Sequence, residues 1–172
     1  MKILYICTHN RCRSILSEAI TNHFASDEVE TQNRIEAKSA GSQPSGEVHP
    51  LSLKYLQEAG IATDGLKSQS WDEFEDFAPD VVVTVCDSAA GESCPVWFGN
   101  SIKIHWGLTD PSKMAESAHS EKESSEKESS EEEIAQAFQN TIEEIKQRVL
   151  ALKEIAHIKE PEALRKELNK LI

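Results

Sequence analysis

The amino-acid sequence predicts an α/β fold with three layers, α/β/α, around a central sheet of four parallel strands. Short runs rich in β-branched residues alternate along the chain with segments whose apolar residues recur at helical spacing. Strands that alternate with helices form parallel sheets that are covered on both faces. The length of 172 residues suits one compact core. We therefore expect a single domain over residues 1–172.

Each expected element has its own local signal. The strands are expected at residues 2–7, 34–39, 81–85 and 102–106, and the run Val81 to Val85 after Pro79-Asp80 is the strongest of them. The helices are expected from Ile15 to Phe24, at residues 50–59 with Gly60 as the stop signal, at residues 134–155, and in a short C-terminal extension at about 161–172. Pro161 should break the long helix before that extension.

An acidic insertion of low complexity is expected at about residues 116–133. It contains eight Glu and two Lys, and the pentapeptide Ser-Glu-Lys-Glu-Ser occurs twice in tandem from Ser120. Such a stretch cannot bury enough apolar surface to offset the entropy lost on ordering. It is therefore expected to be solvated, either disordered or as a frayed helix. A phosphorylated acidic segment is the functional alternative.

The overall charge excludes two classes of partner. A formal net charge of -12 provides no basic surface for nucleic acid or for an anionic membrane. The apolar run at residues 3–7 is too short for a signal peptide or a membrane span, so a cytoplasmic location is expected. The four cysteines should then be reduced, which favours reactive roles over structural disulfides.

The loop between the first strand and the first helix predicts an oxyanion site. Cys7 lies at the carboxyl end of a strand and Arg13 follows six residues later, where the loop enters a helix. Amide groups at a helix start bind tetrahedral anions, and an arginine adds a bidentate contact. The same positive field should lower the pKa of Cys7 and activate it as a nucleophile. A cysteine that simply ends a strand is the alternative, and the glycine-rich pattern of a nucleotide-binding loop is absent from this stretch.

The segment CTHNRCRSILSEA resembles the active-site loop and first helix of the low-molecular-weight protein tyrosine phosphatase fold. Cys7, Asn10, Arg13 and Ser14 occupy the positions of that signature. The resemblance implies that Asn10 holds the shape of the loop and that Ser14 hydrogen-bonds the thiolate. The expected oxyanion-binding residues are Thr8, His9, Asn10, Arg11, Cys12 and Arg13.

Two of these loop residues, His9 and Arg11, could alter which anion the loop prefers, and the role of a third, Cys12, has two interpretations. His9 stands where the family often has Gly, and Arg11 is an additional cation. Cys12 is expected to be a bystander, with a regulatory disulfide to Cys7 as the alternative.

Asp110 is the candidate general acid. It follows the fourth predicted strand, so it should lie at the same sheet edge as the loop. An Asp-Pro pair is an ordinary turn by itself. However, the segment HWGLTDP resembles the acid-bearing loop of arsenate reductases of this fold, and the resemblance implies the catalytic role. Ser112 and Lys113 follow where phosphatases of the family tend to carry aromatic residues that grip a phenyl ring.

Two further cysteines separate a reductase from a phosphatase. Cys86 ends the third predicted strand and Cys94 follows eight residues later. They could instead be a core thiol and a loop thiol, or bind a metal, but zinc sites normally use closer cysteine spacing. The segment CDSAAGESCP resembles the redox loop of thioredoxin-coupled arsenate reductases. The resemblance implies that Cys86 attacks Cys7 and that Cys94 then attacks Cys86.

The sequence therefore predicts reduction of arsenate to arsenite, with phosphate and sulfate as competing anions. The expected catalytic residues are Cys7, Arg13, Ser14, Asp110, Cys86 and Cys94. Thioredoxin, or glutaredoxin with glutathione, would supply the electrons, and no metal or other cofactor is expected. Two alternatives stay open: a low-molecular-weight protein tyrosine phosphatase, and a non-catalytic module that binds oxyanions or senses redox state.

Overall fold

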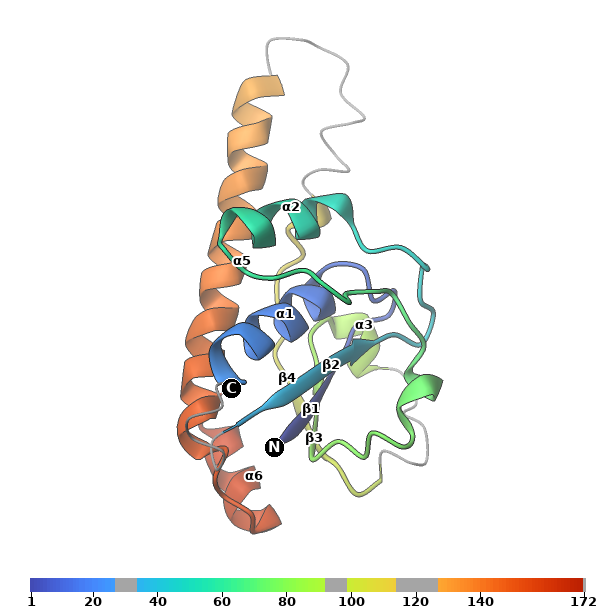
Figure 1. Cartoon of the computed structure of the whole chain (residues 1–172), viewed down its shortest axis with the longest axis vertical. Helices are drawn as coiled ribbons and strands as arrows, with labels where there is room; N and C mark the ends of the chain where they lie inside the picture. Colours follow the sequence, from blue (N-terminus) through green and yellow to red (C-terminus); the bar gives the residue numbers. More distant parts are fainter. Residues whose placement is uncertain (27–33, 92–98, 114–126, 172) are drawn as a thin grey trace.

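The computed structural model describes residues 1–26, 34–91, 99–113 and 127–171. Its strands are β1 (Lys2–Ile6), β2 (Glu36–Ala40), β3 (Val81–Thr84) and β4 (Ile102–His105). Its helices are α1 (Arg13–Ala25), α2 (Pro50–Glu58), η2 (Trp71–Phe74, a 3-10 helix), α3 (Asp87–Ala90), α5 (Lys127–Ile155) and α6 (Pro161–Asn169). The strands form one sheet in the order β2-β1-β3-β4, and each neighbouring pair is parallel (Figure 1). The predicted α/β class with four parallel strands is confirmed.

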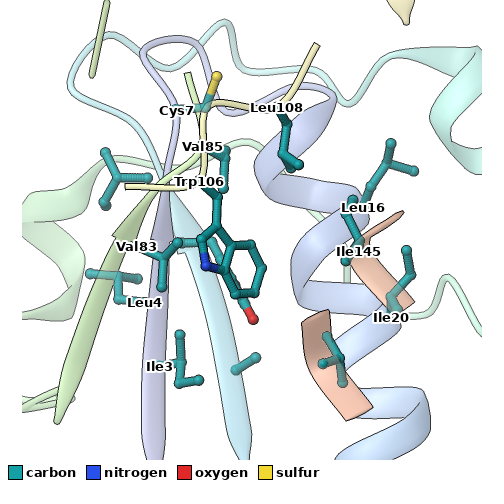
Figure 2. Packing of buried hydrophobic residues seen from close by; sticks show 14 of the residues in the cluster. Ile3, Leu4, Cys7, Leu16, Ile20, Val83, Val85, Trp106, Leu108 and Ile145 are labelled. Carbon is teal, nitrogen blue, oxygen red and sulfur yellow. The ribbon is translucent and has the colours of Figure 1, made fainter. Parts of the chain in front are cut away.

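The sheet is buried on both faces at its centre. Successive side chains of a strand point to opposite faces, yet all four residues at positions 3–6 are at most 1% exposed. Figure 2 shows α1 and α5 beside the sheet, with Leu16 and Ile20 of α1 close to Ile145 of α5. Covered faces explain why β1 and β3 are continuous apolar runs rather than alternating ones.

Local capping explains where two of the helices begin. The ring Nδ1 of His49 accepts a hydrogen bond from the Leu51 N–H at 3.1 Å, directly before α2. The Glu160 carboxylate accepts from the N–H groups of Glu162 and Ala163 at the start of α6. Pro161 is the first residue of α6, where a missing N–H costs nothing. The long helix α5 ends at Ile155, ahead of Pro161, so this proline starts the next helix rather than breaking the long one.

The observed boundaries refine those predicted from the sequence. Strands end within one or two residues of the expected positions, whereas η2 and α3 were not predicted. The long helix α5 begins at Lys127 rather than at residue 134, so residues 127–133 of the acidic insertion are helical. Residues 114–126 lie outside the described part of the chain. Among the helices that the structure describes, none combines the length and apolar character needed to cross a membrane.

The parallel arrangement places the predicted reactive residues at one edge of the sheet. β1 and β3 are neighbours, so Cys7 and Cys86 leave adjacent strands at their carboxyl ends. The Val85 N–H donates to the Ile6 carbonyl at 3.0 Å, which extends the pairing to the last residue before Cys86. β4 lies beside β3 and leads into the loop that carries Asp110. This edge is where ligands bind in open α/β sheets.

Candidate active site

Asn10 fixes the shape of the loop between β1 and α1. Its φ of 47° is in the left-handed region, which asparagine tolerates better than most residues. The side chain is fully buried, and its Nδ2 donates to Ser14 Oγ at 2.8 Å. Its Oδ1 accepts from the Gln69 N–H at 2.8 Å. These contacts agree with the predicted role of Asn10, while Ser14 is seen here as the partner of Asn10.

The segment after β2 packs tightly against the backbone of this loop. A Cβ on Gly41 would lie 2.5 Å from the Thr8 carbonyl oxygen and 2.7 Å from that of Cys7. No side chain fits at such distances, so Gly41 permits the close approach. The Gln43 N–H also donates to the Thr8 carbonyl at 2.9 Å. Gly41 was not among the predicted site residues.

A cavity of about 260 Å³ lies beside this loop. Its lining includes eight of the predicted site residues: Cys7, Thr8, His9, Arg11, Cys12, Arg13, Cys86 and Asp110. Ser88, Ser112 and Lys113 also line it, whereas the predicted Asn10 and Ser14 do not. Three of the lining side chains are arginine or lysine, and Asp110 is the single carboxylate among them. The cavity is therefore a cationic site in a chain of net charge -12, as an oxyanion site requires.

Arg13 is held by two partners and keeps one donor for a ligand. Its Nη1 donates to the Leu108 carbonyl at 3.0 Å, and its Nη2 lies 3.5 Å from Asp110 Oδ2. Its Nε is buried without a hydrogen-bond partner in the described structure. A buried donor without a partner is costly, and a tetrahedral oxyanion in the cavity would satisfy it.

Cys7 and Cys86 form a coupled pair of thiols in this cavity. Both are buried and line the same cavity, close enough that a side-chain hydrogen bond between them is the largest influence on the pKa of each. This hydrogen bond, with further donors from the N–H groups of Thr8 and Ala89, lowers the pKa of Cys86 to about 5. The same hydrogen bond, together with burial, raises the pKa of Cys7 well above its ordinary value. The predicted lowering of the pKa of Cys7 is therefore wrong for this arrangement, because the pair shares one proton and the charge rests on Cys86.

Cys12 is a neutral thiol behind the loop. Burial raises its pKa to about 12, and it is also hydrogen-bonded by Ser52 and Ser112. Its carbonyl accepts from the Leu16 N–H at 2.8 Å at the start of α1. Cys7, Cys12 and Cys86 are all free in this structure. The disulfide between Cys7 and Cys12, which was the alternative to a bystander role for Cys12, is not formed in this structure.

Asp110 is oriented toward the cavity by Ser112. Its Oδ1 accepts from the Ser112 N–H at 2.9 Å and from the Ser112 hydroxyl at 2.6 Å. The second oxygen faces Arg13. The sequence placed the acid at this edge, and the structure places it in the same cavity as Cys7. The arrangement places a thiol, a guanidinium and a carboxyl group in one cavity.

Two other predicted residues have contacts that bear on their roles. His9 Nδ1 donates to the Gln43 carbonyl at 3.1 Å, so this ring is directed to the segment after β2. Thr8 Oγ1 lies 3.9 Å from Cys86 Sγ, which links the loop to the second thiol. Cys94 lies outside the described residues, and its place in the site stays a prediction.

A buried polar chain behind the loop was not predicted. Gln69 Nε2 donates to the Ser39 carbonyl at 3.1 Å, and the Ser39 hydroxyl donates to Glu18 Oε2 at 2.8 Å. Burial raises the pKa of Glu18 to about 7. Glu18 follows Ser14 by one helical turn, and only this spacing hinted at a shared face. The chain ties α1, β2 and the loop before η2 together.

Comparison with known proteins gives the class of protein that this fold and site define. The family model described as low molecular weight phosphotyrosine protein phosphatase matches residues 2–170. The chain therefore belongs to this family.

Within the family, several proteins similar to this chain are named arsenate reductases. The chain is 35% identical over 120 residues to an arsenate reductase of Halalkalibacterium halodurans, covering 70% of this chain and 80% of the relative. It is 36% identical over 125 residues to that of Shouchella clausii, covering 70% and 81%. The thioredoxin-dependent arsenate reductase of Corynebacterium glutamicum superposes with a TM-score of 0.61 at 26% identity, over 90% of this chain and 61% of that one. The chain thus spans less than two thirds of that structure.

Proposed function

We propose that this protein reduces arsenate to arsenite through a relay of Cys7, Cys86 and Cys94. The observation that carries the proposal is the contact between two free thiols in one cationic cavity. A phosphatase needs one thiol, an arginine and an acid, whereas a two-electron reduction needs a second thiol within reach. The relatives named as arsenate reductases support the same substrate.

Arsenate binds between the loop amides and Arg13. The start of α1 directs N–H groups and the positive end of the helix dipole at the anion. The buried Nε of Arg13 supplies a charge-assisted hydrogen bond that has no other partner in the described structure. Phosphate and sulfate share the tetrahedral shape and negative charge of arsenate, so both compete for the site.

The first step joins Cys7 to arsenic. The two sulfurs share one proton, and its transfer from Cys7 to Cys86 along their hydrogen bond makes Cys7 the attacking thiolate. An S–As bond forms while an As–O bond breaks. Asp110 protonates the departing oxygen, which leaves as water. Asp110 is placed for this by Ser112 and by its position in the same cavity.

The second and third steps carry the electrons away. Cys86, whose thiolate is favoured by N–H donors from Thr8 and Ala89, loses its proton to solvent and attacks the sulfur of Cys7. An S–S bond forms, the S–As bond breaks, and its electron pair stays on arsenic, which leaves as arsenite. Cys94 then attacks Cys86, releasing the thiol of Cys7 and leaving a disulfide between Cys86 and Cys94.

Thioredoxin is the proposed electron donor, with glutaredoxin and glutathione as the alternative. The name of the Corynebacterium glutamicum relative supports thioredoxin. These reductants belong to the cytoplasm, which is the proposed location. No metal or cofactor takes part in the relay. The lining of the cavity by Ser112 and Lys113 favours a small oxyanion over an aryl ester.

Replacing the relay cysteines tests the proposal. In Cys86→Ser and Cys94→Ser, arsenate-dependent oxidation of thioredoxin should cease, while slow hydrolysis of an aryl phosphate by Cys7 should survive. If both variants keep multiple turnover with arsenate, the relay is wrong. A phosphotyrosine phosphatase would be insensitive to both changes and prefer phosphopeptides. A non-catalytic module would bind arsenate tightly without turnover.

A further inference from the structure

The imidazole of His105 spans the turn that presents Cys86 to Cys7. We infer that His105, acting through Asp87, is a positioning residue for the relay: it holds the first turn of α3 so that the Cys86 sulfur stays against Cys7. The inference rests on the proposed function, because it concerns the step in which Cys86 attacks. Neither residue lines the cavity, so neither is proposed to touch the substrate.

The contacts of His105 lie on both sides of that turn. His105 is the last residue of β4, next to β3 in the sheet. Its Nδ1 lies 2.8 Å from Thr84 Oγ1 and 3.0 Å from the Thr84 carbonyl. Its Nε2 lies 2.9 Å from Asp87 Oδ1. Thr84 precedes the turn and Asp87 is the first residue of α3, so the ring bridges residues 84 to 87.

These contacts keep a proton of the ring directed at Asp87 in either protonation state. In the neutral ring, the Thr84 hydroxyl can donate to Nδ1, which leaves the N–H at Nε2 to donate to Asp87. In the charged ring, Nδ1 donates to the Thr84 carbonyl and Nε2 again donates to Asp87. Thr84 therefore supplies whichever partner Nδ1 needs, and the contact with Asp87 persists.

Gly107 provides the space that this bridge requires. A Cβ there would lie 3.3 Å from His105 Nε2 and 3.8 Å from Asp87 Oδ1. The φ of Gly107 is 43°, a conformation that favours glycine. The chain thus turns away from the ring directly after β4 and leaves the contact between the two side chains unobstructed.

The contact with His105 fixes Asp87, and Asp87 in turn fixes the first turn of α3, which positions Cys86. The Ala89 N–H donates to Cys86 Sγ at 3.4 Å, so the sulfur itself caps this short helix. If the first turn frays, that donor is lost and the sulfur is no longer directed at Cys7. The Asp87 side chain is 94% exposed, so its contact with His105 is weak. Losing this contact should slow the attack of Cys86 on Cys7 only about two- to fivefold.

The Cys94→Ser chain isolates the step in question. With excess arsenate and no reductant, the proposed reaction stops at the disulfide between Cys7 and Cys86, with release of one arsenite. The rate at which this disulfide appears, followed by quenched-flow mass spectrometry, reports the attack of Cys86. In this background, His105→Ala and Asp87→Ala should each slow the reaction about two- to fivefold. Asp87→Asn keeps an acceptor oxygen and should restore part of the rate.

Two further readouts separate positioning from general damage. Hydrolysis of an aryl phosphate needs no disulfide between Cys7 and Cys86, so Asp87→Ala should slow it less than it slows formation of that disulfide. Asp64→Ala, at another exposed aspartate, is the matched control and should leave the disulfide rate unchanged. The inference is overturned if His105→Ala and Asp87→Ala both form the disulfide at the parent rate. If the Cys94→Ser parent forms no such disulfide with arsenate, the proposed function itself fails.

Discussion

Two turns leave the same edge of the sheet, each beginning with a cysteine, but they are held in different ways. The loop at residues 7–13 follows β1, and its shape depends on buried contacts: Asn10 between Ser14 and Gln69, and the close packing of Gly41. The turn at residues 86–90 follows β3 and depends on a sulfur cap and on the exposed contact between Asp87 and His105.

This difference matches the work that each turn does in the proposed relay. The first turn must hold a tetrahedral anion in one geometry, which favours buried and fully satisfied hydrogen bonds. The second carries a sulfur that attacks one partner and is then attacked by another, so it has to move. Weak, exposed contacts are the kind that open at low cost. Changes in the first turn should therefore be severe, and changes in the second should be graded.

Arg13→Lys should produce the largest loss. Lysine cannot reproduce the planar fork that holds Leu108 and Asp110 and carries the buried Nε. We expect arsenate kcat/KM to fall about 100- to 1,000-fold, as for loss of an oxyanion donor. Arg11→Lys is the control at a partly exposed cation of the same cavity and should change kcat/KM by about threefold or less. Little or no loss in Arg13→Lys would mean that charge alone, not the fork, determines binding.

Gly41→Ala should damage the first turn. The new methyl group would meet two carbonyl oxygens at 2.5 and 2.7 Å, so the loop must shift. Overpacking of this kind costs about 1–3 kcal/mol, and the displaced loop should lose most arsenate turnover. Gly91→Ala, after α3, is the matched control, because its Cβ would come no closer than 3.7 Å to Ser88. Urea denaturation and steady-state assays of both variants check the contrast.

Glu18→Gln tests the buried polar chain behind the first turn. Because the pKa of Glu18 is raised from 4.5 to about 7, the carboxyl contributes stability that is fully present below pH 4.5 and lost as pH rises through 7. The glutamine variant should match the parent near pH 4 and exceed it by about 3 kcal/mol at pH 8.

The measurement for Glu18 is the free energy of unfolding as a function of pH. Glu36→Gln, at an exposed carboxyl of β2, is the control and should differ from the parent by about 0.5 kcal/mol or less. If the stability difference between Glu18→Gln and the parent is the same at pH 4 and pH 8, the pKa of Glu18 is not raised.

The smallest signal is the absorbance of one thiolate. The lowered pKa of Cys86 predicts a thiolate at this residue at pH 7 that is lost as pH falls through about 5. Thiolate absorbance near 240 nm should follow that titration, and alkylation mapped by peptide mass spectrometry should modify Cys86 before Cys12. Preferential labelling of Cys7 would mean that the thiolate is on Cys7, in the first turn, and not on Cys86, in the second.

Much of this arrangement could be predicted because it is encoded locally. Strand runs, helical spacing and the cysteines at strand ends depend on neighbouring residues, and parallel pairing then brings Cys7, Cys86 and Asp110 to one edge. Contacts between distant residues could not be predicted in the same way. Gln69 lies 59 residues from Asn10, and no periodic signal connects them.

The ionisation and the contacts of the site residues were also harder to predict than their positions in the fold. The loop alone favours a thiolate on Cys7, but the pairing of β1 with β3 brings a second thiol against it and moves the charge. Similarly, His105 looked like part of an acid-loop motif, and only the register of β3 and β4 places it over the turn of Cys86.

The tether between Asn10 and Gln69 also has a consequence for the order in which the protein is assembled. The loop that binds the anion is complete only when the segment before η2 has docked on it, through Asn10 Oδ1 and through the hydrogen bond from the Gly41 N–H to the Gln69 carbonyl. Contacts of such sequence separation form late because closing a long loop costs entropy. During synthesis, we therefore expect the nascent chain to acquire anion affinity only after Gln69 has left the ribosome.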